Sequence, residues 1–471
     1  MEESGLIDAE GNRLFKNTDS NGRFHSDWCS MIYSRLMLAR NLLLPDGIIC
    51  ISMDDNEETN LKNICNEVFN QKNCIGEIIR KTKSMTADNG NGFNLQHEIL
   101  LIYAKDASRV FLYGEQKEFA NYSNPDNDPN GDWCTADPSA RSGGDTTYFG
   151  IENPYTHRID YPPVGRYWAF SKSTMEQYIA TGRMKFKTQY GPNERGFIFK
   201  RYKNNMTVTT EPVNSLFALD NEYMNQAATI ELKKLFEESY FSYPKPVEFI
   251  KKLVQYTDAD VIMDFFSGSG TTAHAVMQLS AEDGKKRNYI MVQLPEALQK
   301  GTAPYNAGYR NLCEIGRERI RRAAKKIAEE IPGASFDSGF RVFKLDESNM
   351  KGVFYAPADY DQDLLSMLES NIKEDRTDLD LLFGSLLEWG LPLSMPYTSE
   401  EISGCTVHTY NDGDLIACFD ENIPDDVVKT IAKRQPLRAV FRDSSFSNSP
   451  SKINVGEIFK LMAPDTRVKV I

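Results

Sequence analysis

A glycine-containing segment, DFFSGSGTTAHAV at residues 264–276, has the residue types and spacing of a ligand-binding turn. The apolar residues 261–263 before it predict a buried strand, and residues 273–279 after it predict a helix. A tight turn between a strand and a helix brings a ligand next to the unpaired N–H groups and partial positive charge of the helix N-terminus. The segment therefore predicts a binding site in an α/β fold.

Three interpretations of this turn are open on its residues alone. Gly268, Gly270 and Ala273 have the G-x-G-x-x-A spacing of dinucleotide sites, in which a pyrophosphate lies on the helix N-terminus. Asp264 favours S-adenosylmethionine instead, because a carboxylate at the strand end repels a pyrophosphate but attracts an ammonium group. The third interpretation is a tight turn without a ligand. A Walker phosphate loop is excluded, since no Lys-Ser/Thr pair follows a second glycine at the required distance.

Hydrophobic periodicity and turn residues predict the elements that position this turn. The predicted helices cover residues 26–44, about 54–69, 246–256 and 310–331, and further strands cover residues 48–53, 75–79, 98–104 and 289–294. Ser26 is the expected cap of the first helix. The strand at 261–263, the helix after the turn and the strand at 289–294 form a β-α-β unit. From residue 340 the pattern predicts a separate mixed α/β domain.

Composition indicates a cytoplasmic globular protein. No apolar run reaches the roughly 18 residues of a membrane span, and the polar first residues do not form a signal peptide. The eight cysteines include no C-x-x-C pair, and the five histidines are scattered, so we expect reduced cysteines and no metal site.

Charge is distributed unevenly along the chain, whose net charge is −13. Residues 156–205 contain 10 Lys/Arg and 3 Asp/Glu interleaved with aromatic residues, whereas residues 336–471 contain 14 basic and 23 acidic side chains. The basic stretch predicts either a nucleic-acid surface or a solvated charged surface over an aromatic core. The predicted helix at 310–331 carries a second basic group, from Arg317 to Lys326, which suits either DNA contact or an exposed amphipathic face.

Several segments together resemble a known family. "DFFSGSGTTAHAV", with "SYPKPVEFIKKL" upstream and "YIMVQLPE" downstream, is similar to the cofactor-binding half of β-class amino-methyltransferases, and specifically to the methylation (Mod) subunits of type III restriction–modification systems. The resemblance extends over nearly the whole chain, through "SDWCSMIYSRLMLARNLLLPDGIICISMDDNE", "HEILLIYAKD", "YPPVGRYWAFSKSTMEQ" and "FRVFKLDESN". It implies a site-specific DNA adenine-N6 methyltransferase that uses S-adenosylmethionine.

The resemblance also implies the fold and its division into parts. We expect a permuted, Rossmann-like S-adenosylmethionine-dependent methyltransferase fold with an incomplete sheet. Its catalytic half covers residues 1–110, a target-recognition region 111–240, the S-adenosylmethionine-binding half 241–332 and a C-terminal assembly domain 336–471.

The family pattern places the cofactor on one set of residues. The methionine part is expected to lie against Lys245, Pro246, Asp264, Phe265, Phe266, Gly268, Gly270 and Thr271. The rings of Phe265 and Phe266 also suit an adenine or a cationic sulfur. Gln293 is the expected ribose contact, with Glu296 as the alternative.

The basic stretch corresponds to the target-recognition region of the family. Its expected DNA contacts are Arg166, Lys172, Arg183, Lys185, Lys187, Lys200, Arg201 and Lys203. The implied partners are double-stranded DNA, a restriction (helicase/endonuclease) subunit and a second copy in a homodimer, with assembly through the acidic domain.

One part of the family pattern is missing. No Asp-Pro-Pro-Tyr tetrad occurs, so no catalytic residues are assigned, and Asn153-Pro154-Tyr155 is rejected because it lacks a proline and no apolar strand precedes it. In the family this tetrad accepts the adenine amino hydrogens, stacks on the flipped base and lies on the strand between those at 48–53 and 261–263. We therefore expect a chain that lacks its N-terminal segment, a gap between these two strands, and little activity.

Two other functions remain open from the residues. The G-x-G-x-x-A turn permits a nicotinamide-dependent oxidoreductase, although this function has no use for a basic, aromatic insert. A non-catalytic fragment for DNA recognition and assembly is also compatible with the missing tetrad.

Overall fold

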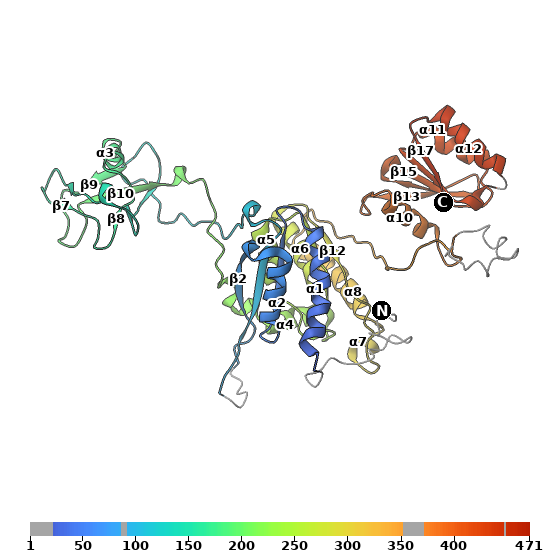
Figure 1. Ribbon diagram of the computed structural model, residues 1–471, viewed down its shortest axis with the longest axis horizontal. Helices are drawn as coiled ribbons and strands as arrows, with labels where there is room; N and C mark the ends of the chain where they lie inside the picture. The colour runs from blue at the N-terminus through green and yellow to red at the C-terminus, as the bar shows by residue number, and fades with distance from the viewer. Residues whose placement is uncertain (1–21, 86–91, 352–371, 447–448) are drawn as a thin grey trace. The chain divides into compact units, whose positions relative to one another are not determined.

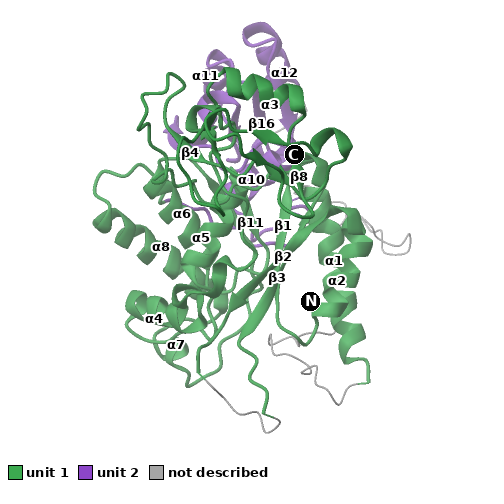
Figure 2. Ribbon diagram, turned by 90° about the vertical axis from the view of Figure 1, so that its left-hand side faces the viewer, with its two compact units in different colours: residues 1–338 green, residues 339–471 purple. Residues whose placement is uncertain are grey.

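The computed structural model describes residues 22–85, 92–351, 372–446 and 449–471 (Figure 1). The chain divides into two compact units, Met1–Ser338 and Gly339–Ile471 (Figure 2). The predicted start of the C-terminal domain, residue 336, is close to this division. The other predicted domain boundaries stay predictions. Short 3-10 turns cover Gln71–Asn73, Ala107–Arg109, Asp145–Thr147, Lys203–Asn205, Phe217–Leu219, Asn221–Tyr223, Asn411–Gly413 and Asp443–Ser445.

The first part of unit 1 is an antiparallel sheet covered by two helices. The sheet has the order β1-β3-β2 and is made by β1 (Ile48–Met53), β2 (Cys74–Lys81) and β3 (His97–Ala104). Helices α1 (Phe24–Leu42) and α2 (Glu58–Cys65) pack over it, and a π-helical turn, Asn66–Asn70, continues α2. The prediction of β1 is confirmed to the residue. The predicted cap of α1 was wrong, because α1 begins at Phe24 and Ser26 lies inside it.

A β-α-β unit forms the second part of unit 1. Strands β11 (Val261–Asp264) and β12 (Asn288–Met291) pair in parallel, and α6 (Thr271–Asp283) connects them. Helix α6 is buried on nearly all sides because it packs against α5 (Val247–Thr257), α8 (Leu312–Glu330) and β12. The short helix α7 (Ala303–Asn306) precedes α8, and α4 (Asn225–Phe236) also packs against α8. The turn of interest therefore joins a strand end to a fully enclosed helix.

No hydrogen-bonded ladder joins these two sheets in the described residues. β1 pairs only with β3, and β11 pairs only with β12. Helix α5 holds the sheets together, because Phe249 packs with residues of β1–β3 while Val254 packs with residues of β11, β12 and α6. The expected gap between the two sheets is confirmed. One face of the smaller sheet stays exposed, with Val261 and Ile290 accessible by 58% and 49%.

Residues 111–205 form a small, irregular body around an aromatic core. Its three-stranded sheet has the order β4-β10-β9. The strands are β4 (Trp133–Thr135), β9 (Met184–Phe186) and β10 (Phe197–Tyr202), with α3 (Lys172–Ala180) beside them. Two further pairs are β5 (Ser139–Ala140) with β8 (Tyr167–Trp168), and β6 (Ile151–Glu152) with β7 (Ile159–Asp160). Trp168, Phe197 and Phe199 are buried in the core, so these aromatic residues are structural.

Unit 2 is a five-stranded sheet covered on both faces. Its order is β13-β14-β15-β16-β17, antiparallel at first and parallel at the end. The strands are β13 (Tyr397–Ile402), β14 (Cys405–Tyr410), β15 (Leu415–Cys418), β16 (Arg438–Phe441) and β17 (Arg467–Val470). Helices α11 (Asp425–Lys433) and α12 (Ser449–Met462) cover one face, and α10 (Asp378–Glu388) covers the other.

Two expectations from composition are also tested by the structure. All eight cysteines are free, as predicted. Within the described part of the chain, no helix is both long enough and apolar enough to span a membrane.

Candidate functional site

The turn between β11 and α6 depends on two glycines with left-handed backbone conformations. Gly268 has φ +50° and Gly270 has φ +79°, a region that other residues rarely adopt. A β-carbon on Gly270 would also lie 3.2 Å from the carbonyl oxygen of Gly316 on α8. The turn is therefore tight on both sides, and its backbone faces the N-terminus of α6 as the sequence predicted.

Hydrogen bonds connect the ends of β11 and β12 to this turn. Asp264 accepts from the hydroxyl of Thr272 at 2.6 Å and from the backbone N–H of Phe266 at 3.1 Å. Gln293 accepts from the backbone N–H of Gly268 at 2.8 Å. The structure thus brings together Asp264, Gln293 and the glycines that sequence analysis assigned to one site. Glu296 is exposed, and no side-chain bond joins it to the turn in the described residues.

A cavity of about 340 Å³ lies at the ends of β1 and β3. It is lined by Asp54, Asp55, Thr82, Lys83, Leu95, His97, Glu98, Asn225, Tyr243 and Lys245. Of these, only Lys245 was assigned from the sequence. The acidic pair Asp54-Asp55 directly follows β1, and His97 begins β3. The antiparallel pairing of Met53 with Ile99 brings these strand ends together, and that pairing was the missing information.

Lys245 belongs to a buried group of alternating charges. Its ammonium lies 2.6 Å from Glu98, whose carboxylate also accepts from Arg80 at 2.8 Å. Arg80 is fully buried and donates to the backbone carbonyl of Tyr223. Burial would raise the pKa of Glu98, but the bond from Arg80 and the charge of Lys245 lower it overall. Burial lowers the pKa of Lys245, with Glu98 opposing this shift. This network holds Lys245 at the cavity wall.

One segment links the cavity to the glycine turn. The ring of Phe241 lies 3.1 Å from the position of a β-carbon on Gly268, and Tyr243 and Lys245 line the cavity a few residues later. Pro246 is buried at the N-terminus of α5. Phe265 packs against the core of the first sheet, whereas Phe266 is 59% exposed, with the ring centres 5.2 Å apart. Phe266 is thus the ring of this pair that is accessible to a ligand.

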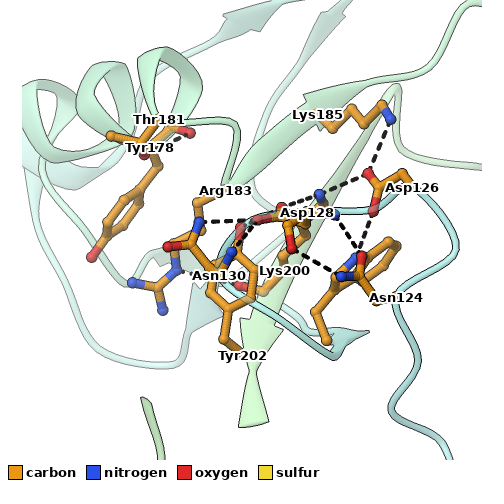
Figure 3. Close-up of polar contacts among 11 residues, drawn as sticks. Asn124, Asp126, Asp128, Asn130, Tyr178, Thr181, Arg183, Lys185, Lys200 and Tyr202 are labelled. Atoms are coloured by element: carbon orange, nitrogen blue, oxygen red, sulfur yellow. Dashed lines mark hydrogen bonds and ion pairs between the residues drawn. The ribbon is translucent and has the colours of Figure 1, made fainter. Parts of the chain in front are cut away.

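The second predicted surface, in residues 156–205, is organised around a buried lysine (Figure 3). The ammonium of Lys200 is 2.8 Å from Asp126 and 2.5 Å from Asp128, and only 3% of the side chain is exposed. Tyr202 donates to Asp128, and Trp133 donates to Asp126. The assignment of Lys200 as a DNA contact was wrong, because its charge is enclosed by two carboxylates of the same chain.

A sequence signal for this arrangement exists. Asp126, Asp128, Asn130 and Gly131 have the D-x-D-x-N-G spacing of loops that surround a cation. Here the cation between the carboxylates is the side chain of Lys200. The pattern indicates a loop whose carboxylates bind a cation, and the fold shows that Lys200 is this cation.

The other expected DNA contacts fall into two groups. Lys185 pairs with Asp126, Lys187 with Glu194 and Arg166 with Asp137, while Arg183 lies over the rings of Tyr178 and Phe199. In contrast, Lys172, Arg201 and Lys203 are exposed, and no ion pair involves them in the described residues, although the ammonium of Lys203 lies 5.1 Å from the ring centre of Phe119. Arg141, which sequence analysis did not select, is similar. Counted over residues 111–205, 12 basic side chains face 11 acidic ones, so the net charge of this body is +1.

Asn153 of the rejected Asn-Pro-Tyr segment has a structural role. Its buried side chain donates to the carbonyls of Lys187 and Gly196 at 2.9 and 2.7 Å and accepts from the N–H of Tyr155. All of its hydrogen-bonding groups are engaged within the turn. This accounts for the residue without a role in catalysis.

One cluster of metal-ligand types occurs in the described residues, although the sequence predicted none. Cys405, Cys418 and Asp420 in unit 2 have ligand atoms within 4.8 Å of one another. Burial raises the pKa of Cys405, and it raises the pKa of Cys418 to about 12. Both shifts favour the neutral thiol in the protein without a metal, and the expectation of no metal site stays a prediction.

Comparisons with known proteins identify several similar chains. A family model described as DNA methylase matches residues 11–325. The Mod subunit of the type III restriction-modification enzyme StyLTI from Salmonella typhimurium is 33% identical over 350 residues, which are 72% of this chain and 51% of that subunit. The EcoPI Mod subunit of Escherichia phage P1 is 29% identical over 87% of this chain and 66% of the relative.

Similar chains also occur outside type III systems. The type II methyltransferase M.KpnI of Klebsiella pneumoniae is 27% identical over 66% of this chain and 76% of the relative. Among solved structures, TTHA0409, a putative DNA modification methylase from Thermus thermophilus complexed with S-adenosyl-L-methionine, aligns with a TM-score of 0.30 and 12% identity. That alignment covers 68% of this chain and 84% of the other. The chain spans about half the length of the StyLTI subunit.

Proposed function

Because the chain belongs to the DNA methylase family, we propose that it serves as the site-specific DNA adenine-N6 methyltransferase subunit of a type III-like restriction–modification system. Family membership confirms the α/β S-adenosylmethionine-dependent methyltransferase fold that the sequence predicted. The comparisons give no support to the nicotinamide-dependent oxidoreductase. The reaction, its substrate and its partners are the proposal.

The chemistry of the cavity is the observation that carries this function. The lining contains the carboxylates of Asp54, Asp55 and Glu98 and the ammonium groups of Lys83 and Lys245, of which Lys245 is paired with Glu98. This combination complements a ligand with both an ammonium and a carboxylate, such as the methionine part of S-adenosylmethionine. A pyrophosphate would meet the carboxylates of Asp54 and Asp55 here, at an electrostatic cost. The residues present therefore fit the methyl donor better than a dinucleotide.

Each residue of the site has a distinct part in this proposal. Lys245 would hold the carboxylate of the cofactor, Asp54 and Asp55 its ammonium, and Phe266 its adenine or sulfonium. Gln293 holds the turn through Gly268, and we propose it as the ribose contact. When bound, S-adenosylmethionine supplies an electrophilic methyl group. The chain's own contribution is to hold the methyl donor at a fixed place and orientation, which accounts for much of the rate in such transfers.

The proposal extends to partners and location. Double-stranded DNA would bind the body formed by residues 111–205, and the acidic unit 2 would contact a restriction subunit or a second copy of the chain. Four relatives are, by name, Mod subunits of type III or probable type III restriction-modification enzymes. We propose a cytoplasmic protein on the same grounds.

Ligand binding by the purified chain tests the cofactor assignment. S-adenosylhomocysteine is expected to raise the melting temperature, whereas NADH is not. Lys245→Met should weaken S-adenosylhomocysteine binding at least about 10-fold, since it removes a charge-assisted contact. Asp264→Ala should also weaken it, because Asp264 holds the turn through Thr272 and the N–H of Phe266. Asp260→Ala, at an exposed acid just before β11, is the matched control and should leave affinity unchanged. Tight NADH binding without S-adenosylhomocysteine binding would contradict the proposal.

A further inference from the structure

Arg319 lies directly beneath the glycine turn. Its side chain extends from α8 and is fully buried, with an exposed fraction of 0%. One terminal nitrogen, Nη1, donates to the hydroxyls of both Ser269 and Thr271, at 2.7 Å each. Arg319 therefore fits neither alternative left open for this basic helix, DNA contact or an exposed amphipathic face. Its neighbours Arg321 and Lys325 do lie in exposed positions.

A second residue of α8 completes the contact. Gly316, one helical turn before Arg319, lies against the turn so closely that a β-carbon there would be 3.5 Å from the carbonyl oxygen of Gly268. In the opposite direction, a β-carbon on Gly270 would be 3.2 Å from the carbonyl oxygen of Gly316. The absence of a side chain at residue 316 thus allows the helix to approach the turn. Arg319 then reaches both hydroxyls that flank Gly270.

Burial of the charged Arg319 side chain lowers the free energy of unfolding, which argues against a purely structural role. Nε and Nη2 of Arg319 have no hydrogen-bond acceptor among the described residues, and the nearest carboxylate, Glu231, is 4.0 Å away. Burial lowers the pKa of Arg319 to about 10, so the guanidinium is still charged at neutral pH. A buried charge with unsatisfied N–H groups usually contributes little or nothing to net stability. A purely structural role would be served as well by an apolar side chain.

We propose that Arg319 is a positioning residue for the cofactor, which fixes the conformation of the 267–272 turn through Ser269 and Thr271. The two hydroxyls precede and follow Gly270, so a single nitrogen that bonds both holds the turn on either side of its left-handed glycine. The turn is then held in one conformation before a ligand binds. This inference rests on the proposed S-adenosylmethionine site, and it adds a residue on a helix outside the β-α-β unit.

Two substitutions at this position test the proposal on the full chain. Arg319→Met removes the donor and the charge, and Arg319→Lys retains the charge but reaches one hydroxyl at most. We expect hydrogen–deuterium exchange of the 265–275 peptide, without ligand, to become at least about 10-fold faster in Arg319→Met and to change less in Arg319→Lys. Lys325→Met, at an exposed position on the same helix, is the matched control and should have no effect.

Cofactor affinity provides the second measurement. Arg319→Met should weaken S-adenosylhomocysteine binding at least about 10-fold while the melting temperature changes little. In a Ser269→Ala/Thr271→Val background, where the hydroxyls are absent, the same substitution should have almost no further effect on affinity. Additive losses would show that Arg319 acts by another route and would overturn the proposal.

The outcomes separate this inference from the proposed function. If the unmodified chain does not bind S-adenosylhomocysteine, the cofactor assignment fails, and the exchange of the turn still decides the role of Arg319. If exchange of the 265–275 peptide is the same in Arg319→Met and the unmodified chain, the positioning role is wrong. Should Arg319→Met not fold, the Ser269→Ala/Thr271→Val variant must itself accelerate exchange of the turn for the proposal to stand.

Discussion

The ammonium of Lys200 lies 2.8 Å from the carboxylate of Asp126, although residue 200 is on a core strand and residue 126 is on a loop 74 positions earlier. Asp128 accepts from the same ammonium. The ion pairs attach the loop to β10 (Figure 3). They also neutralise the charge of Lys200, which the sequence suggested for contact with DNA. Most of the basic side chains in residues 156–205 are therefore paired with carboxylates of the same chain.

Replacing Lys200 with methionine should destabilise residues 111–205. The substitution leaves Asp126 and Asp128 without their cation, and the loss of one partner from a buried ion pair costs about 3 kcal/mol or more. Lys185→Met removes an exposed partner of the same Asp126 and should cost no more than about 1 kcal/mol. Urea unfolding followed by near-ultraviolet circular dichroism measures both. Equal effects of the two substitutions would contradict the central role of Lys200.

The same group predicts the pH range in which this body is stable. The hydrogen bond from Lys200 holds the pKa of both Asp126 and Asp128 well below the usual range. A depressed carboxyl pKa contributes stability above the unfolded value of about 3.9, and this contribution is lost as the pH falls below that value. Acid unfolding should therefore begin at a higher pH in Lys200→Met, where the shift is absent. The indole N–H signal of Trp133, which donates to Asp126, reports the transition. An unchanged acid transition would contradict this assignment.

DNA affinity should depend on the exposed cations and not on the paired ones. Charge reversal at Lys172, Arg201 and Lys203 is expected to weaken DNA binding and to lower its salt dependence, by about one unit of slope for each phosphate that is no longer neutralised. Lys185→Gln/Lys187→Gln removes two cations that already have carboxylate partners and serves as the control. Fluorescence anisotropy over a range of salt concentrations measures both slopes. A larger decrease of the salt-dependence slope in the control would show that the paired cations contact DNA and the exposed ones do not.

Removing unit 2 should abolish assembly. Residues 336–471 carry 23 acidic and 14 basic side chains, which makes contact with phosphates unfavourable and favours contact with a protein partner. A chain ending at Ser338 retains its own sheets and helices, since the division between compact units lies there. Analytical ultracentrifugation should show self-association for the full chain only. Retained self-association after the deletion would rule out this surface.

Methyl transfer to DNA by the 471-residue chain alone should be undetectable. The sequence contains no Asp-Pro-Pro-Tyr, and the described residues leave the outer edges of β1 and β11 without the strand that carries this tetrad in the family. Loss of positioning and charge stabilisation together removes many powers of ten in rate. Tritium transfer from labelled S-adenosylmethionine measures this, with the EcoPI Mod subunit as the positive control. Comparable rates of methyl transfer for the two chains would contradict the inference that this chain lacks the catalytic tetrad.

Local sequence patterns were sufficient for the elements that carry the cofactor turn. The short apolar run Ile48–Met53 predicted β1 to the residue, and the glycine spacing at Gly268 and Gly270 predicted a tight turn, in which both residues have left-handed conformations. These features depend on the conformational preferences of a few adjacent residues, so they are readable without knowledge of the rest of the chain. The family resemblance rests on the same local segments.

Charge and burial, in contrast, were decided by tertiary structure. Arg319 and Arg321 are two residues apart in one basic helix, yet only Arg319 faces the glycine turn and is buried. Lys200 and Arg201 are adjacent, but the alternation of β10 directs the first inward to Asp126 and Asp128 and the second to solvent. Asp54 and Glu98 meet in one cavity only because β1 and β3 are antiparallel. The sequence determines which groups are charged, whereas the partner of each charge depends on contacts between residues far apart in the chain, which no local pattern contains.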